Sequence, residues 1–111
     1  MSKGAAASRG LVRQGDLLLV PVSALPEFAK KVGSGRLVLA EGEATGHAHV
    51  VDDERASLYG SATGRHLSIE GEGPVYVVHE EHDRLPLHPG VYEVRRQREY
   101  VPQRRSRWVT D

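Results

Sequence analysis

The sequence predicts a small all-β domain, a barrel or sandwich of about seven or eight short antiparallel strands with at most one short helix. Short runs of β-branched and other apolar residues alternate along the chain with turns rich in glycine and proline. The turns recur about every eight to twelve residues, a spacing typical of small β domains. No long helical repeat of apolar residues is present in the sequence, so neither a helical bundle nor an α/β fold is expected.

Strands are expected where apolar and β-branched residues cluster or alternate with polar ones. The run Val75–His79 gives the strongest signal, because nearly all of its residues favour extended backbone. In the run Val91–Tyr100, alternation places Tyr92 and Val94 on one face and their neighbours on the other. The expected strands cover residues 17–22, 36–40, 47–51, 56–59, 66–70, 75–79, 91–100 and 107–110. Pro21 is expected at a strand end or a sheet edge, because proline donates no hydrogen bond to a neighbouring strand.

One helix of one or two turns is expected at Ser23–Val32. Pro26 is tolerated in a first helical turn, and Lys30 and Lys31 suit a helix C-terminus. The glycines that follow would end the helix. Turns are expected at residues 14–16, 52–55, 71–74, 80–83 and 89–90, where glycine, proline or charged residues gather.

Length and composition indicate one soluble domain. The chain has 111 residues, no cysteine, a mean hydropathy of −0.44 and no apolar run of membrane-spanning length. We expect a flexible tail at residues 1–10, a single β domain at residues 11–111, no membrane partner and a cytoplasmic location. Without cysteine, any transition metal would have to be bound by histidine and carboxylate side chains.

The formal net charge is zero but is unevenly distributed. Residues 41–83 hold ten acidic and two basic residues, a net charge of −8, and five of the six histidines. The flanking segments, residues 1–40 and 84–111, each carry a net charge of +4. An acidic, histidine-rich centre is compatible with a cation site, although on charge alone a solvated acidic face balanced by basic neighbours is the favoured interpretation.

The segment Glu41–Val51 is the strongest candidate for a site. On a strand, His47 and His49 point to the same side because side chains alternate with a period of two. His79 is the preferred third ligand, and His82 can join it only if the chain turns at Glu80–Glu81. These four histidines are the predicted ligands of a divalent metal (Zn, Ni, Mn or Fe), or of an anionic ligand. The alternative is that they are surface or structural histidines, which is our interpretation of His66 and His88.

Several other functions are disfavoured by the sequence. It contains no Gly-x-Ser-x-Gly motif, no cysteine nucleophile and no phosphate-binding loop. Arginines near Tyr92, Tyr100 and Trp108 could bind a nucleic acid backbone, but a charged edge strand is the favoured interpretation. Those arginines are Arg95, Arg96, Arg98, Arg104, Arg105 and Arg107.

The central segment resembles the first metal motif of the cupins. Gly42, His47-Ala48-His49, Glu54 and Gly60 approximate that motif, with each outer gap one residue off. The resemblance implies that His47, His49 and Glu54 would bind a metal. The second cupin motif needs a histidine after a Pro-x-Gly turn, and no histidine follows Pro89-Gly90 here.

A second resemblance covers most of the chain. The sequence is similar to a family of small, uncharacterised proteins in bacterial and phage genomes. Four motifs carry it in order: Gln14-Gly15-Asp16, Gly42-Glu43-x-Thr45-Gly46-His47-Ala48-His49, His79-Glu80-Glu81-His82 and Pro89-Gly90-x-Tyr92-x-Val94-x-x-Gln97-Arg98-Glu99-Tyr100. The resemblance implies a β domain and brings no known activity.

Three functions remain open from the sequence. The preferred one is a small β-barrel binding module that holds a metal or an anionic ligand through its histidines. The second is a structural or assembly protein, phage-associated or a homo-oligomer, in which the histidines are incidental. The third is a cupin-like metalloenzyme, and the sequence favours a binding module over an enzyme.

Overall fold

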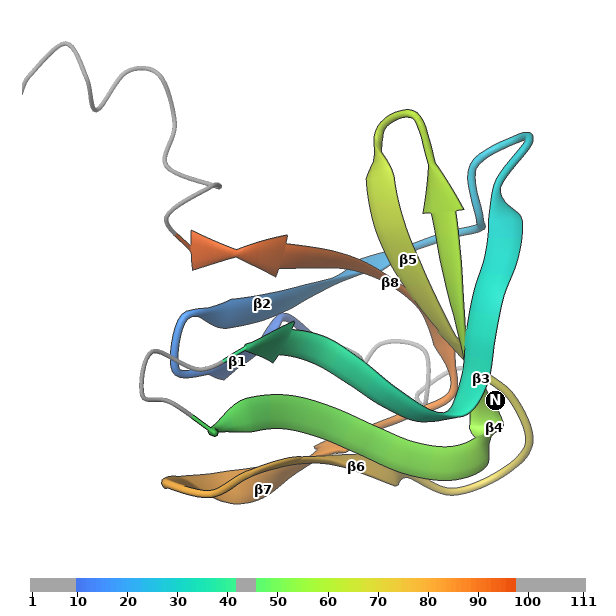
Figure 1. The fold of residues 1–111 in the computed structure, drawn as a ribbon. Coiled ribbons are helices and arrows are strands. Elements are labelled where there is room, and N and C mark those ends of the chain that lie inside the picture. The colour runs from blue at the N-terminus through green and yellow to red at the C-terminus, as the bar shows by residue number, and fades with distance from the viewer. Residues whose placement is uncertain (1–9, 42–45, 98–111) are drawn as a thin grey trace, which may run out of the picture.

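The computed structural model describes residues 10–41 and 46–97, and it confirms the all-β prediction. These residues form eight strands that build a nearly closed antiparallel barrel (Figure 1). The strands are β1 (Val12–Gln14), β2 (Leu17–Val22), β3 (Lys30–Glu41), β4 (Ala48–Ser61), β5 (Gly64–Ile69), β6 (Val75–His79), β7 (His82–Leu87) and β8 (Gly90–Arg96).

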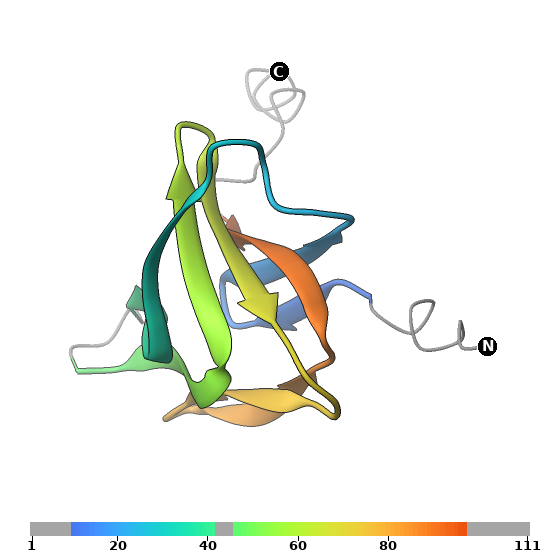
Figure 2. The same ribbon diagram turned by 90° about the vertical axis from the view of Figure 1, so that its right-hand side faces the viewer.

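The strand order around the barrel is β1-β2-β8-β5-β4-β6-β7, and β3 pairs with β4 outside this path. Strand β4 connects the two halves of the barrel, one formed with β6 and β7 and the other with β5, β8, β2 and β1. Its residues Val50 and Val51 pair with β6, whereas Ala56–Ser61 pair with β5. Figures 1 and 2 show β3 and β4 bending together as they cross from one half to the other. Strands β1 and β7 then come into contact and bring the two ends of the sheet together.

The core follows from the alternation of apolar side chains along the strands. In β6, Val75 and Val77 are buried while Tyr76 and Val78 face solvent. In β8, Tyr92 and Val94 lie on one face of the strand, as the sequence predicted, and this face points into the core. Leu17, Leu19, Leu39, Val51, Leu67 and Leu87 complete the packed interior. The apolar faces of both halves therefore meet in one hydrophobic core.

The predicted helix at Ser23–Val32 is wrong. Ala29 N–H donates a single turn-type hydrogen bond to the Pro26 carbonyl (3.2 Å), and Phe28 has a φ of 69°, which ends any helical path. Lys30 already pairs with Gly60 of β4, so the end of the predicted helix is the start of β3. Cross-strand pairing overrides the weak local helix signal here.

The predicted turn at residues 52–55 is also wrong, because β4 runs through it. The pairing of β3 with β4 steps from Ser34↔Ser57 to Gly35↔Asp53, which leaves extra residues of β4 in a bulge. Asp53 and Arg55 hydrogen-bond to each other at this bulge. The polar residues that suggested a turn instead mark the bend of a long strand.

The chain turns near residues 14–16, 71–74 and 89–90 as predicted, whereas the turn predicted at residues 80–83 is shorter, because β7 begins at His82. The chain turns at Glu80–Glu81, so that His79 and His82 become cross-strand neighbours. Pro21 pairs with Tyr92 on β8, while β1 covers only Leu17–Leu19 of β2. Pro21 therefore lies where β2 has an open edge. The predicted strand at residues 107–110 lies outside the described residues.

Candidate metal centre

Three sequence motifs meet at one end of the barrel. The first part of β4 brings His49, and His47 lies just before it. The β6–β7 hairpin brings His79 and His82, and the β1–β2 turn brings Gly15. A Cβ atom on Gly15, which has a φ of +60°, would lie 2.9 Å from His82 Nε2 and 3.3 Å from His49 Cε1. Glycine at this turn therefore lets the backbone pack directly against two imidazole rings.

The four predicted histidines lie next to one another. The ring centroids of His49 and His79 are 4.3 Å apart, and those of His79 and His82 are 4.6 Å apart. His47 lies 5.7 Å from His79 in an edge-on arrangement, and His49 lies 6.1 Å from His82. The hairpin turn is what places His79 and His82 side by side.

Donor atoms for a metal ion gather at His47, His79 and Glu80. One donor atom from each of these three side chains lies within 4.8 Å of the other two. His47 Nδ1 is shielded from solvent and has no hydrogen-bond partner among the described residues, although Glu81 Oε2 is 3.6 Å away. An imidazole nitrogen in this state can accept a metal ion without first giving up a hydrogen bond.

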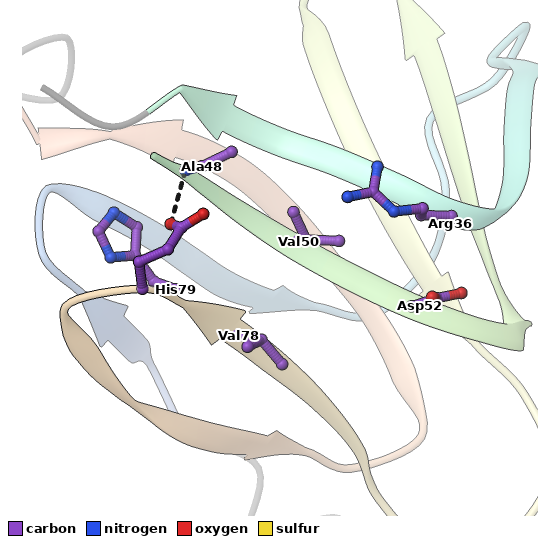
Figure 3. Close-up of a pocket in the computed structure, with 7 residues that line it drawn as sticks. Arg36, Ala48, Val50, Asp52, Val78 and His79 are labelled. Atoms are coloured by element: carbon purple, nitrogen blue, oxygen red, sulfur yellow. Dashed lines mark hydrogen bonds between the residues drawn. The ribbon is translucent and has the colours of Figure 1, made fainter. Parts of the chain in front are cut away.

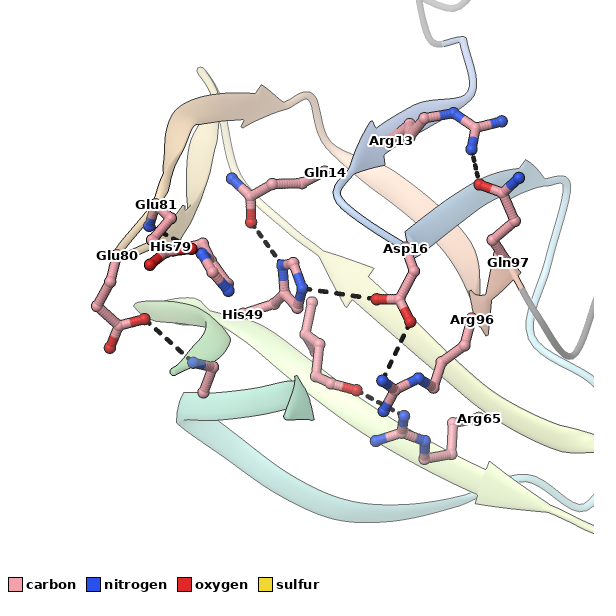
Figure 4. A network of polar contacts seen from close by, with 12 residues as sticks. Arg13, Gln14, Asp16, His49, Arg65, His79, Glu80, Glu81, Arg96 and Gln97 are labelled. Carbon is pink, nitrogen blue, oxygen red and sulfur yellow. Dashed lines mark hydrogen bonds and ion pairs between the residues drawn. The ribbon is translucent and has the colours of Figure 1, made fainter. Parts of the chain in front are cut away.

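Glu80 is held in place by the backbone. Its Oε1 accepts a hydrogen bond from Ala48 N–H at 3.1 Å, which ties the β6–β7 hairpin to the start of β4 (Figure 4). Hydrogen bonds from its own N–H and from that of Ala48 hold the pKa of the Glu80 carboxyl below its usual value. The side chain is therefore a carboxylate near neutral pH and can bind a cation.

His49 is the most buried of the four histidines and is fixed by Gln14. Gln14 Nε2 donates to the carbonyls of Val77 and Asp83, at 3.1 Å and 2.9 Å, so Gln14 Oε1 is left to face His49 Nδ1 at 2.8 Å. The neutral His49 ring therefore carries its proton on Nδ1 and keeps a lone pair on Nε2. Metal-binding histidines show this arrangement, in which one nitrogen donates to a fixed acceptor and the other is free to bind.

The electrostatic setting keeps His49 neutral. Desolvation by burial, followed by the neighbouring His79, lowers the pKa of His49 to about 4, although Asp16 acts in the opposite direction. His49 Nε2 lies 3.9 Å from Asp16 Oδ1, and Asp16 Oδ2 is bound by Arg96 at 3.1 Å (Figure 4). The His49 lone pair thus faces an anionic oxygen, an arrangement that a cation between them would stabilise.

The hydrogen bonding of the His79 ring differs from that of His49. Its Nδ1 accepts a hydrogen bond of 3.0 Å from Glu81 N–H, so the neutral ring carries its proton on Nε2. A metal that binds Nδ1 must displace the Glu81 N–H. Binding through Nε2 requires the ring proton to move to Nδ1, which also breaks this hydrogen bond. Metal binding at His79 therefore changes the turn of the β6–β7 hairpin.

A surface pocket of about 320 Å³ adjoins this cluster (Figure 3). His79 and Glu80 line one end of the pocket, and Arg36 and Asp52 line the other. Val50 and Val78 form an apolar floor between the two ends. The outer face of the barrel therefore joins the candidate metal ligands to a cavity of the size that small molecules occupy.

Three residues that contribute to the cluster, Gln14, Asp16 and Glu80, are not among the candidates predicted from the sequence. The sequence predicts only a turn at Gln14–Asp16. The role of Gln14 and Asp16 appears because the barrel brings them beside His49, 35 positions from Gln14. Glu80 lies at the predicted turn and is not among the predicted ligands. Its signal is that it directly follows His79 at the predicted turn Glu80–Glu81.

The other predicted candidates lie elsewhere or have different partners. Glu54, the third ligand of the cupin-like motif, is exposed at the bend of β4. His66 is buried on β5, and His88 is exposed after β7, where its carbonyl accepts a hydrogen bond from the Tyr92 hydroxyl.

The predicted basic patch is only partly described. Arg95 forms an ion pair with Glu93 at 2.9 Å, and Arg96 binds Asp16. Those two arginines thus have partners within the domain. The residues Arg98, Arg104, Arg105 and Arg107, together with Tyr100 and Trp108, lie outside the described residues.

Comparison with known proteins places the chain in a family but gives no function. No curated protein and no solved structure matches the sequence. None of the described segments forms a helix long and apolar enough to cross a membrane. The match to the family called Domain of unknown function (DUF8820) spans residues 13–97, which includes all three motifs at the end of the barrel. The chain is therefore a member of the DUF8820 family.

Proposed function

We propose that this domain binds a divalent transition metal ion at one end of its barrel, with His47, His79 and Glu80 as protein ligands. The observation that carries the proposal is the gathering of one donor atom from each of these three side chains within 4.8 Å of one another. His47 Nδ1, in addition, has no hydrogen-bond partner among the described residues. His79 is buried, whereas His47 and Glu80 reach solvent, so an ion has an entry path.

The donor set favours a borderline metal. Two imidazoles and one carboxylate suit Zn²⁺, and also Fe²⁺, Ni²⁺ or Mn²⁺, better than they suit Ca²⁺ or Mg²⁺, which prefer oxygen donors. Three protein ligands leave at least one coordination position for water or a bound molecule. Zn²⁺ is the first ion to test because it accepts this ligand set without a redox requirement.

Binding requires the ligands to move closer together. Donor atoms around a tetrahedral zinc ion with bonds of about 2.0–2.1 Å lie about 3.4 Å apart. The separation of up to 4.8 Å therefore has to shorten by about an ångström or more. Rotation of the half-buried His47 side chain can supply much of this movement, and a rotation of Glu80 would break its hydrogen bond from Ala48 N–H, while the Gln14–His49 pair keeps the surrounding wall fixed.

Isothermal titration of Zn²⁺ into the purified, chelator-treated protein tests the proposal. We expect one ion per chain, and we expect His47→Ala, His79→Ala and Glu80→Gln each to weaken binding at least about tenfold. The matched controls are His88→Ala and Glu54→Gln, which remove a histidine and a carboxylate outside the cluster. Absence of zinc binding by the unchanged protein, or equal losses in the control variants, would overturn the proposal.

The hairpin gives a second, independent readout. Because a metal at His79 removes the acceptor of Glu81 N–H, zinc should shift the amide resonance of Glu81 and speed its hydrogen exchange. The same measurement on His79→Ala supplies the control, since that variant has no such acceptor to lose.

A further inference from the structure

We propose that the pocket beside the metal cluster binds a short dicarboxylate-like molecule, one end of which pairs with Arg36 while the other occupies the open position on the metal. This inference rests on the proposed metal site and names the class of molecule that would reach it. Its basis is the arrangement of charged and apolar groups along the outer face of β3, β4 and β6 (Figure 3).

The apolar floor, formed by Val50 and Val78, belongs to a row of outward-facing valines across neighbouring strands. Val38 pairs with Val50, and Val50 pairs with Val78, so the three side chains form one row across the sheet. Val38 and Val78 have 39% and 50% of their surface exposed. Apolar side chains that line a concave surface between two polar ends suit a ligand with a short hydrocarbon middle.

Arg36 supplies the fixed positive charge. It is opposite Asp52 in the pairing of β3 with β4, yet the two form no ion pair, and no hydrogen bond occupies Arg36 among the described residues. Figure 3 shows its guanidinium turned toward the Val50 end of the pocket, with the Asp52 carboxylate on the far side. A guanidinium that faces an apolar floor is matched to a carboxylate, which it can bind with two parallel hydrogen bonds.

The distance along the sheet sets the length of the ligand. Asp52 and Ala48 are four residues apart on β4, so the Arg36 end and the Glu80 end lie about 13 Å apart at the usual rise of a strand. The Arg36 side chain and the metal ligands reach toward each other along the sheet, which shortens the distance that a ligand has to bridge. The gap that remains fits a chain of roughly four to six carbons with an oxygen donor at each end.

The closing experiment uses glutarate, a five-carbon dicarboxylate, and follows the methyl resonances of Val50 and Val78 by NMR. In the zinc-loaded protein we expect both valines to shift on titration, with binding about tenfold or more tighter than in the metal-free protein. Pentanoate, which has one carboxylate and can reach only one of the two ends, should bind the zinc-loaded protein about tenfold or more weakly than glutarate does. Arg36→Gln should weaken glutarate binding about tenfold.

Arg84→Gln is the matched control, because Arg84 lies over the ring of Tyr76 on the same face and does not line the pocket. It should leave the glutarate affinity unchanged. The inference would be overturned if glutarate did not shift the methyl resonances of the two valines. It would also be overturned if the glutarate affinity did not depend on zinc or on Arg36. Zinc titration without glutarate separates the cases: if zinc binds and glutarate does not, this inference alone fails, and if zinc does not bind, the metal proposal fails as well.

Discussion

At the scale of single residues, the pair Gln14–His49 determines what the cluster can do. Two backbone carbonyls hold the Gln14 amide, and the amide in turn fixes which nitrogen of His49 carries the proton. Burial then keeps the ring uncharged. The neutral His49 ring has a lone pair on Nε2, and this nitrogen faces Asp16. His49 and Asp16 therefore add groups that can interact with a cation to those of His47 and His79.

The titration of His49 gives the first prediction. In chelator-treated protein, the Cε1 proton resonance of His49 should titrate with a midpoint of about 4, because burial and His79 disfavour the charged ring. NMR across pH 3.5–8 measures it directly. A midpoint near the ordinary histidine value of about 6.5 would contradict the buried, Gln14-bound arrangement.

The same titration affects stability. Between about pH 6.5 and pH 4 the unfolded chain binds a proton at His49 that the folded chain does not, so the free energy of unfolding should fall as the pH falls through this window. A shift from 6.5 to about 4 corresponds to a limit of about 3 kcal/mol. Urea denaturation at several pH values gives the free energy of unfolding at each pH. This free energy should change less steeply with pH in His49→Gln than in the unchanged protein. An equal dependence of the free energy of unfolding on pH in the two proteins would show that His49 does not contribute to it.

At the scale of elements, Arg55 fixes the loop that joins the two halves of the barrel. Its guanidinium donates to the carbonyls of Gly73 and Pro74, at 3.1 Å and 3.0 Å, and to that of Glu72. Asp53 binds the same guanidinium, and this contact lowers the pKa of the Asp53 carboxyl. The bulge of β4 therefore holds the β5–β6 loop, which sets the direction of β6 and so the position of His79.

Two glycines in this loop give a matched test. Gly71 and Gly73 both have positive φ, +85° and +79°, but only at Gly71 would a Cβ meet another group, Arg55 Cδ at 2.8 Å. Gly71→Ala should therefore destabilise the protein more than Gly73→Ala, by about 1 kcal/mol in chemical denaturation. In an Arg55→Ala background the difference should disappear. Equal effects of the two substitutions in the unchanged protein would contradict the clamping role of Arg55.

The sequence predicted correctly those strands and turns that depend on a few adjacent residues. Val75–His79 and the turn after it were predictable because β-branched residues and a run of charges act over a few positions. The Ser23–Val32 and Asp52–Arg55 predictions failed because β3 and β4 pair across these segments, and pairing of this kind is not visible in a short window. The four histidines were found from their spacing, whereas Gln14 and Asp16 join them only when the barrel closes.

At the scale of the whole molecule, closure of the barrel and assembly of the site use the same contacts. Gln14 links β1 to β6 and β7 through its two carbonyl partners, and it also holds His49 of β4. On the other side of Gly15, Gln97 N–H donates to the Asp16 carbonyl at 2.6 Å, and the Arg13 guanidinium donates to the Gln97 side chain. Hydrogen bonds therefore join residues from the beginning, middle and end of the matched region 13–97, with Gln14 in contact with His49 of the histidine cluster.

The most direct test of this account is anomalous diffraction at the zinc edge from crystals grown with Zn²⁺. We predict an anomalous peak within bonding distance, about 2.0–2.2 Å, of a nitrogen of His47, a nitrogen of His79 and an oxygen of Glu80. A peak confined to His66 or His88, or the absence of any peak on these three side chains in zinc-saturated crystals, would contradict the proposed metal centre.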